Sequence, residues 1–172
     1  MRKGYIQVYT GNGKGKTTAA LGLALRAAGA GLRVFIAQFV KQRRCSEHKA
    51  LERFSDLIVV KRYGKGFLMK REPGKSDFES AEKGFKEVKD IIASKRYDVV
   101  ILDEINIALR YGLISTEELL DVMEKKPPRV DLVLTGRYAD SRIIEKADLV
   151  TEMKDIKHYS SRGVKARTGV EC

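Results

Sequence analysis

Short apolar segments alternate along the chain with longer segments of helical periodicity. The apolar segments are rich in β-branched residues, which is typical of strands buried on both faces of a sheet. In segment 76–94 apolar residues recur at helical spacing, which predicts an amphipathic helix. The pattern predicts strands at 5–9, 33–39, 57–60, 98–104, 130–135 and 148–153, and helices at 17–28, 46–54, 76–94, 140–146 and from a capping box at 115–118.

This alternation predicts a three-layer α/β domain with a mostly parallel central sheet. We expect one domain over residues 1–172, without internal repeat or linker. Segment 154–172 has little periodicity and several basic residues. It is expected either to fray as a basic terminus or to form an ordered loop over the open edge of the active site.

A glycine-rich loop lies between the first predicted strand and the first predicted helix. Backbone N–H groups converge at such a place and bind polyphosphate. We expect Lys16 to reach phosphate oxygens and the Thr17 hydroxyl to bind Mg²⁺. The loop consists of Gly11, Asn12, Gly13, Lys14, Gly15, Lys16, Thr17 and Thr18.

The loop departs from the usual pattern G-x-x-x-x-G-K-[ST], because Thr10 stands at the position of the first glycine and Gly11 follows it. A ligand-free glycine-rich turn is the alternative. The coincidence of glycines, lysines and paired threonines between a strand and a helix favours the phosphate loop. The domain is therefore expected to be of the P-loop NTPase-like, RecA-like type.

A second group of candidate residues follows other strands. Asp103 and Glu104 end an apolar strand, as the acidic residue of a Walker B feature does, and one of the two would supply a direct or water-bridged second Mg²⁺ ligand beside Thr17. An ordinary acidic strand end is the alternative. Ligands gather at the carboxyl ends of parallel strands. Arg137, Gln38 and Lys41 are expected at the same rim, where Arg137 could neutralise triphosphate charge or be a surface residue.

Composition narrows the possible partners. The formal net charge is +11, from 34 basic and 23 acidic residues. This charge allows nucleic acid or acidic partners, but the mixing of both signs favours a solvated lysine-rich surface. The two cysteines have no metal-ligand spacing and suggest reduced thiols. No apolar run approaches the roughly 20 residues that cross a membrane, and a cytoplasmic protein without membrane or nucleic-acid partners is expected.

The loop alone does not name a reaction, so an ATPase, a kinase and a nucleotide-dependent nucleic-acid-binding module remain alternatives at this point. The pattern as a whole, however, resembles the phosphate-loop type of ATP:corrinoid adenosyltransferase over nearly the whole chain. The matching segments are 11–20, 26–27, 38–41, 102–105, 134–137, 156–158, 163–166 and 169–171.

The resemblance implies that cobalt(I) of a reduced corrinoid attacks the 5′ carbon of ATP and that triphosphate leaves, in adenosylcobalamin biosynthesis or salvage. Lys16, Thr17 and backbone amides would hold the phosphates. Glu104 would help to hold Mg²⁺ (or Mn²⁺), and Arg26 and Arg137 are candidates for contact with ATP. It also implies a homodimer and an electron-donating flavoprotein.

The resemblance further implies a corrinoid-facing loop at 64–75. The family commonly has Gly-Phe-Thr-Trp there, whereas this chain has Gly66, Phe67, Leu68 and Met69 and no tryptophan. Phe67 and Met69 would lie beside the corrin and help to keep the lower face of cobalt free of its nitrogen ligand. Met69 is an apolar, adaptable replacement for the family's tryptophan.

Overall fold

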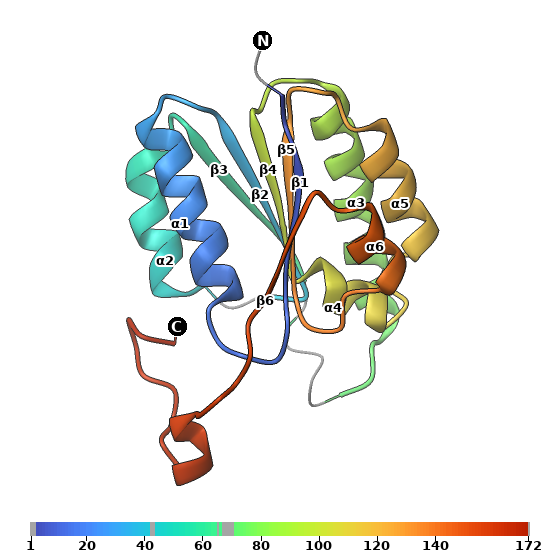
Figure 1. The fold of residues 1–172 in the computed structure, drawn as a ribbon. Coiled ribbons are helices and arrows are strands. Elements are labelled where there is room, and N and C mark those ends of the chain that lie inside the picture. Colours follow the sequence, from blue (N-terminus) through green and yellow to red (C-terminus); the bar gives the residue numbers. More distant parts are fainter. Residues whose placement is uncertain (1–2, 42–43, 65, 67–70, 172) are drawn as a thin grey trace.

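The computed structural model describes residues 3–41, 44–64, 66 and 71–171. Six parallel strands form one sheet in the order β3-β2-β4-β5-β1-β6, and helices cover both of its faces (Figure 1). The strands are β1 (Ile6–Thr10), β2 (Val34–Phe39), β3 (Ile58–Tyr63), β4 (Val99–Asp103), β5 (Asp131–Thr135) and β6 (Leu149–Glu152).

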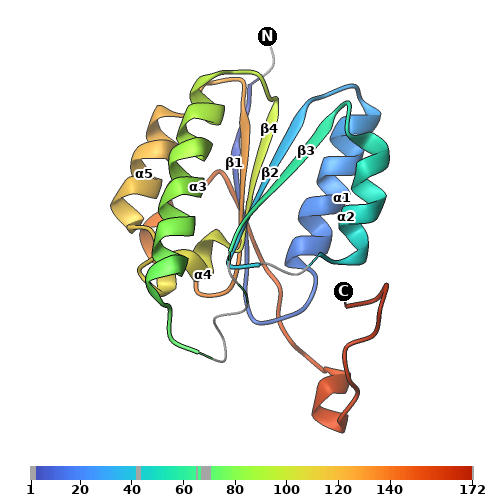
Figure 2. The ribbon, with the colours of Figure 1, turned by 180° about the vertical axis from the view of Figure 1, so that it is seen from behind.

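The helices lie in two layers. Helices α1 and α2 cover one face, and α3, α5 and α6 cover the other, as the opposite views in Figures 1 and 2 show. The short helix α4 follows β4 at the carboxyl ends of the strands. Their bounds are α1 (Lys16–Gly29), α2 (Ser46–Leu51), α3 (Lys75–Ala93), α4 (Ile105–Arg110), α5 (Thr116–Lys125) and α6 (Ser141–Lys146), with 3-10 turns η1 (Glu52–Phe54) and η3 (Tyr159–Arg162).

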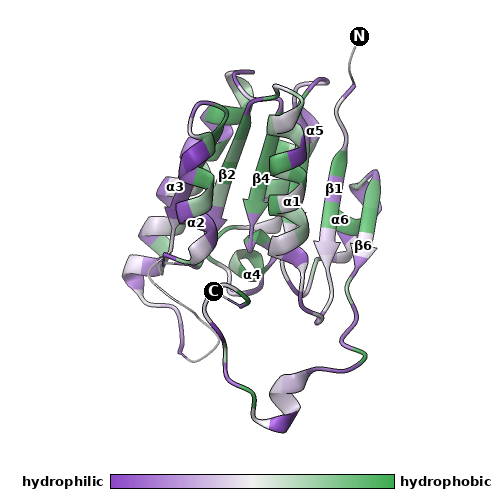
Figure 3. Cartoon of the chain, turned by 90° about the vertical axis from the view of Figure 1, so that its left-hand side faces the viewer, coloured by the Kyte–Doolittle hydropathy of each residue, from purple (hydrophilic) through white to green (hydrophobic). Residues whose placement is uncertain are grey.

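Two hydrophobic clusters fill the spaces between the layers. On one face of β2, Val34 and Ile36 pack with the alanines of α1, whereas Phe35 and Phe39 pack on the other face with α3. This division follows from the alternation of side chains along a strand. Every residue of β2 and β4 is buried, and Figure 3 shows these strands as mostly hydrophobic, with hydrophilic residues at their carboxyl ends. The buried centre of the sheet therefore carries the strand ends where the site lies.

The predicted three-layer α/β class is confirmed, and the sheet is parallel throughout. The structure differs from the predicted elements in a few places. The strand expected at 98–104 ends at Asp103, and the unpredicted helix α4 begins two residues later. The third strand continues to Tyr63. The last strand, β6, is an exposed edge strand, because it pairs only with β1 among the described strands. In the part of the chain described, no helix is long and apolar enough to span a membrane.

Candidate nucleotide site

The glycine-rich loop connects the end of β1 to the first turn of α1. Gly11 and Gly15 have positive φ angles of 92° and 118°, which residues with a side chain adopt only with strain. The N-cap residue of α1 is Gly15, which has no side chain to cap the helix, and the first turn contains no acidic residue. The first N–H groups of α1 therefore remain available for an anion.

The segment that follows β6 lies so close to the glycine-rich loop that two loop positions have no space for a side chain. The backbone N–H of Gly13 donates to the carbonyl of Met153 at 2.7 Å. A Cβ atom on Gly11 would lie 2.4 Å from the same carbonyl oxygen, and one on Gly13 would lie 2.8 Å from it. Both positions thus need glycine in order to hold the loop against this segment.

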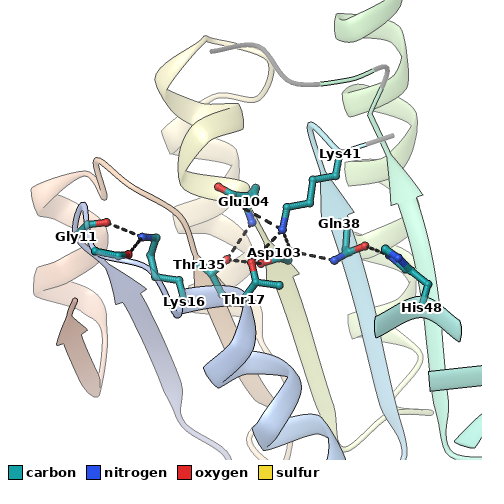
Figure 4. A network of polar contacts seen from close by, with 10 residues as sticks. Gly11, Lys16, Thr17, Gln38, Lys41, His48, Asp103, Glu104 and Thr135 are labelled. Carbon is teal, nitrogen blue, oxygen red and sulfur yellow. Dashed lines mark hydrogen bonds and ion pairs between the residues drawn. The ribbon is translucent and has the colours of Figure 1, made fainter. Parts of the chain in front are cut away.

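The side chain of Lys16 folds back into the glycine-rich loop. Its ammonium donates to the carbonyl oxygens of Gly11 and Gly13, both at 2.7 Å (Figure 4). Burial lowers the pKa of Lys16; Glu104 opposes this effect, and Arg137 adds to it. The ammonium is held by weak neutral acceptors, so phosphate oxygens offer it a stronger charge-assisted partner.

Asp103 is the centre of the polar network. The sheet register places it beside Gln38 of β2, and its neighbour Leu102 beside Leu134 of β5. Its Oδ1 accepts from the hydroxyls of Thr17 and Thr135 at 2.9 and 2.7 Å. Its Oδ2 accepts from Gln38 at 3.0 Å and Lys41 at 2.8 Å.

These donors decide the charge of Asp103. Burial alone would raise its pKa, but the Lys41 ammonium and the hydrogen bonds from Lys41, Thr135 and Thr17 outweigh burial and lower the pKa. The carboxylate is therefore ionised and has four protein donors around its two oxygens. Asp103 organises the strand ends and has little capacity left for a direct ligand.

Lys41 reaches the network from the turn after β2. Its ammonium lies 2.9 Å from the Thr17 hydroxyl and 3.8 Å from a carboxylate oxygen of Glu104, in addition to its contact with Asp103. Burial acts to lower the pKa of Lys41, but the two carboxylates outweigh it and raise the pKa. The preceding residue, Val40, has a φ angle of 65°, which is strained for a β-branched residue.

Glu104 is the more accessible of the two acids. Its φ angle is 59°, and its backbone N–H donates to Thr135 Oγ1 at 3.0 Å, which fixes the left-handed turn. Its side chain is 21% exposed. Burial raises the pKa of Glu104; Lys41 lowers it and Asp103 raises it further. Its carboxylate is thus the acid with room to bind a ligand.

The oxygens around Lys41 fit a divalent cation. The Thr17 hydroxyl and the Glu104 carboxylate are hard oxygen ligands, and both lie near the ammonium of Lys41, beside the anionic Asp103. No cluster of three or more His, Cys, Asp or Glu side chains suited to a metal exists in the described ranges. A Mg²⁺ ion here would depend on phosphate oxygens and water for its remaining ligands, as is usual for this ion.

The structure brings Arg137 to the site and leaves Arg26 away from it. Arg137 is half-buried after β5 and close enough to lower the pKa values of both Lys16 and Glu104. Asn106 holds the turn before it by donating to the Gly136 carbonyl at 3.0 Å. Arg26 is exposed in the last turn of α1, about 15 Å along the helix axis from Lys16.

The outer part of the loop faces the C-terminal segment. Asn12, Lys14 and Thr18 are exposed. The Lys14 ammonium donates to the Tyr159 hydroxyl at 2.9 Å and to Glu171 at 3.0 Å. Tyr159 and Glu171 of the C-terminal segment therefore touch the phosphate loop from outside. The role of this segment as a cover over the active site remains a prediction.

The predicted corrinoid residues Phe67 and Met69 lie outside the described residues. Both flanks of their loop are held by contacts within the described residues, and the first flank lies beside the site. A Cβ atom on Gly64 would meet the backbone nitrogen of Lys41 at 2.6 Å, so the chain leaves β3 directly beside the site. At the other flank, Arg71 forms two hydrogen bonds with Asp77, at 2.6 and 2.7 Å.

Sequence reasoning expected Thr135 at the rim with Arg137 but missed its role, and it missed Asn106 and His48. Thr135 bridges Asp103 and the Glu104 backbone, Asn106 holds the Gly136 turn, and His48 contacts the side chain of Gln38 at 2.5 Å. The role of Thr135 depends on which strands are neighbours, and that order is not written in the sequence. The burial of His48 on a short helix could have been inferred from its position one turn from Leu51.

Known proteins provide an independent comparison. The family model of the ATP:corrinoid adenosyltransferase BtuR/CobO/CobP matches residues 2–172. The chain is 41% identical to a corrinoid adenosyltransferase of Sinorhizobium sp over 98% of this chain and 80% of the relative. It is 36% identical to that of Pseudomonas aeruginosa, over 98% and 84%, and 34% identical to that of Escherichia coli, over 98% and 86%.

A solved structure supports the fold. The KaiC-like protein of Pyrococcus horikoshii is similar with a TM-score of 0.60 and 17% identity, over 87% of this chain and 73% of that protein. At this identity the likeness shows only the shared architecture. The match to the family model and the identity to its members together show that the chain belongs to the ATP:corrinoid adenosyltransferase family, whose members are enzymes.

Proposed function

We propose that the protein transfers the 5′-deoxyadenosyl group of ATP to the cobalt(I) of a reduced corrinoid and releases triphosphate. The observation that carries this proposal is the arrangement of Lys16, Thr17 and Glu104 at the uncapped N-terminus of α1, in a chain that matches the family throughout. The arrangement suits a polyphosphate with a divalent cation. The corrinoid as second substrate is inferred from membership of the family.

The reaction needs alignment and charge neutralisation. Cobalt(I) donates an electron pair to C5′ of ATP, a cobalt–carbon bond forms, and the bond between C5′ and its oxygen breaks. The electrons of that bond leave with triphosphate, and cobalt becomes formally cobalt(III). No proton has to be removed from the nucleophile, so no general base is required. Binding geometry and cations at the leaving group can provide the catalysis.

The residues of the network divide this work. Lys16 and the N–H groups of the loop would bind the triphosphate, and Arg137 would add positive charge from the facing strand end. Bound Mg²⁺ would neutralise the leaving group. Thr17 and Glu104 would hold that ion directly. Asp103 would orient Thr17, because Asp103 accepts a hydrogen bond from the Thr17 hydroxyl.

We further propose that the corrinoid lies against loop 64–75, where Phe67 and Met69 would face it. The support is that Gly64 begins this loop beside Lys41 and that Asp77 anchors its far end. A homodimer, a flavoprotein electron donor and a cytoplasmic location are proposed from the resemblance alone.

Product analysis tests the proposal. The protein is incubated with Mg-ATP and a chemically reduced corrinoid in the dark, and the products are separated and identified. We expect triphosphate and a light-sensitive cobalt–carbon product in equal amounts. Formation of ADP and phosphate without a cobalt–carbon product would contradict the proposal and indicate an ATPase or a kinase.

A further inference from the structure

A chain of hydrogen bonds runs from helix α2 into the nucleotide site (Figure 4). The backbone N–H of Cys45 donates to His48 Nδ1 at 2.9 Å. His48 Nε2 lies 2.5 Å from Gln38 Oε1, and Gln38 Nε2 donates to Asp103 Oδ2 at 3.0 Å. His48 and Gln38 are 8% and 1% exposed, so water has little access to either side chain.

The direction of the chain is set at Asp103. The ionised carboxylate of Asp103 can only accept, so Gln38 presents its amino group to Asp103 and its carbonyl oxygen to His48. An amide oxygen only accepts, so Nε2 of His48 is the donor to Gln38. At the far end, Nδ1 of His48 lies 2.9 Å from the backbone N–H of Cys45 and 3.2 Å from its carbonyl oxygen.

A reversed Gln38 amide would disturb the site. Its oxygen would face Asp103 Oδ2, and its amino group would face the N–H of His48. Both contacts would place like partial charges together in a buried environment. Asp103 holds the hydroxyl of Thr17 and the ammonium of Lys41, so the orientation of Gln38 bears on both groups.

We propose that His48 is a positioning residue of the nucleotide site. Its Nε2–H fixes the amide of Gln38, and Gln38 in turn fixes the carboxylate of Asp103 against Thr17 and Lys41. His48 itself touches no substrate. The inference deepens the proposed function, because it concerns the same nucleotide site.

Binding of Mn-ATP tests the proposal without relying on turnover. Free Mn²⁺ is measured by electron paramagnetic resonance during titration with protein at fixed ATP. His48→Leu removes the donor to Gln38 and should weaken Mn-ATP binding about 5- to 10-fold, the effect expected for the loss of one buried hydrogen bond. His48→Gln restores an N–H donor at the reach of Nε2 and should recover most of the loss.

Further variants separate positioning from packing. His48→Asn keeps a polar side chain but is too short to reach Gln38, and should bind as weakly as His48→Leu. Lys49→Leu changes the exposed face of the same helix and should bind like the wild type. In the double variant Gln38→Leu/His48→Leu, the loss should not exceed that of Gln38→Leu alone, because His48 acts through Gln38.

The outcomes are distinct. Unchanged binding by folded His48→Leu, equal losses for His48→Gln and His48→Leu, or additive losses in the double variant would each overturn the proposal. If His48→Leu does not fold, the comparison of His48→Asn with His48→Gln decides. A wild type that binds no Mn-ATP also overturns it. A wild type that binds Mn-ATP but forms no adenosylated corrinoid contradicts the proposed function only, and the binding series still decides the role of His48.

Discussion

Replacing Lys41 with methionine should leave the Asp103 carboxylate buried without its cation. Asp103 is 1% exposed, and the Lys41 side chain is 17% exposed. Removing one partner of a buried ion pair costs roughly 3–5 kcal/mol of the free energy of unfolding. We expect about 3 kcal/mol at neutral pH, because three other donors remain on Asp103. For a chain of this size, that loss lowers the Tm by roughly 6–12 °C.

The stability difference between Lys41→Met and the wild type should depend on pH in a defined direction. In the wild type the native pKa of Asp103 is lowered, so its ionisation stabilises the fold above the unfolded pKa of about 3.9, and this stability is lost as pH falls through the native value. Without Lys41, burial should raise the native pKa of Asp103 above the unfolded value. The stability difference between Lys41→Met and the wild type should then shrink as pH falls and Asp103 becomes protonated.

Urea unfolding at pH 7.5 and pH 5 measures both effects. Lys61→Met is the matched control, because Lys61 pairs with Glu87 where both side chains are substantially exposed, at 47% and 33%. Such a surface pair contributes about 1 kcal/mol or less. Equal losses for the two variants, or a Lys41→Met deficit that grows towards pH 5, would refute the assignment of Lys41 as the partner that keeps Asp103 ionised.

Three further predictions concern the reaction itself. Lys16→Ala should lower kcat/KM roughly 100-fold or more with the fold intact, because it removes one preorganised cation from the leaving group; unchanged kinetics would exclude the nucleotide site. Glu104→Gln should raise the Mg²⁺ concentration needed for half-maximal rate; an unchanged metal dependence would assign the metal to Asp103 or to neither acid. Phe67→Ala should slow the reaction from cobalt(II) more than from pre-reduced cobalt(I), and Met69→Trp should help only with cobalt(II); equal losses for Phe67→Ala would mean that Phe67 only shapes the pocket.

Much of the fold could be predicted because local signals agree with the global arrangement. The apolar segments that became β2 and β4 are buried on both faces, and the alanines of α1 allow this helix to pack closely on the sheet. Helix α4 was missed because a six-residue apolar segment directly after a strand has no helical signal of its own. Its start depends on the left-handed conformation of Glu104, which the Thr135 hydroxyl holds.

The candidate site could be predicted only where a motif fixes the geometry. The phosphate loop and the strand-ending acids are such motifs. The different roles of Asp103 and Glu104 were not predictable, because they depend on which side chains of β2 and β5 lie beside β4. His48 was not predictable for the same reason: its partner Gln38 belongs to another element and is identified only by the packing of α2 on the sheet.

The bond that breaks in ATP tests the central claim most directly. ATP carrying ¹⁸O at the oxygen between C5′ and the α-phosphorus is incubated with the protein, Mg²⁺ and reduced corrinoid, and the products are analysed by ³¹P nuclear magnetic resonance. Attack at C5′ predicts that all of the label leaves in triphosphate. Label retained in a nucleotide, with the cut at phosphorus, would contradict adenosyl transfer.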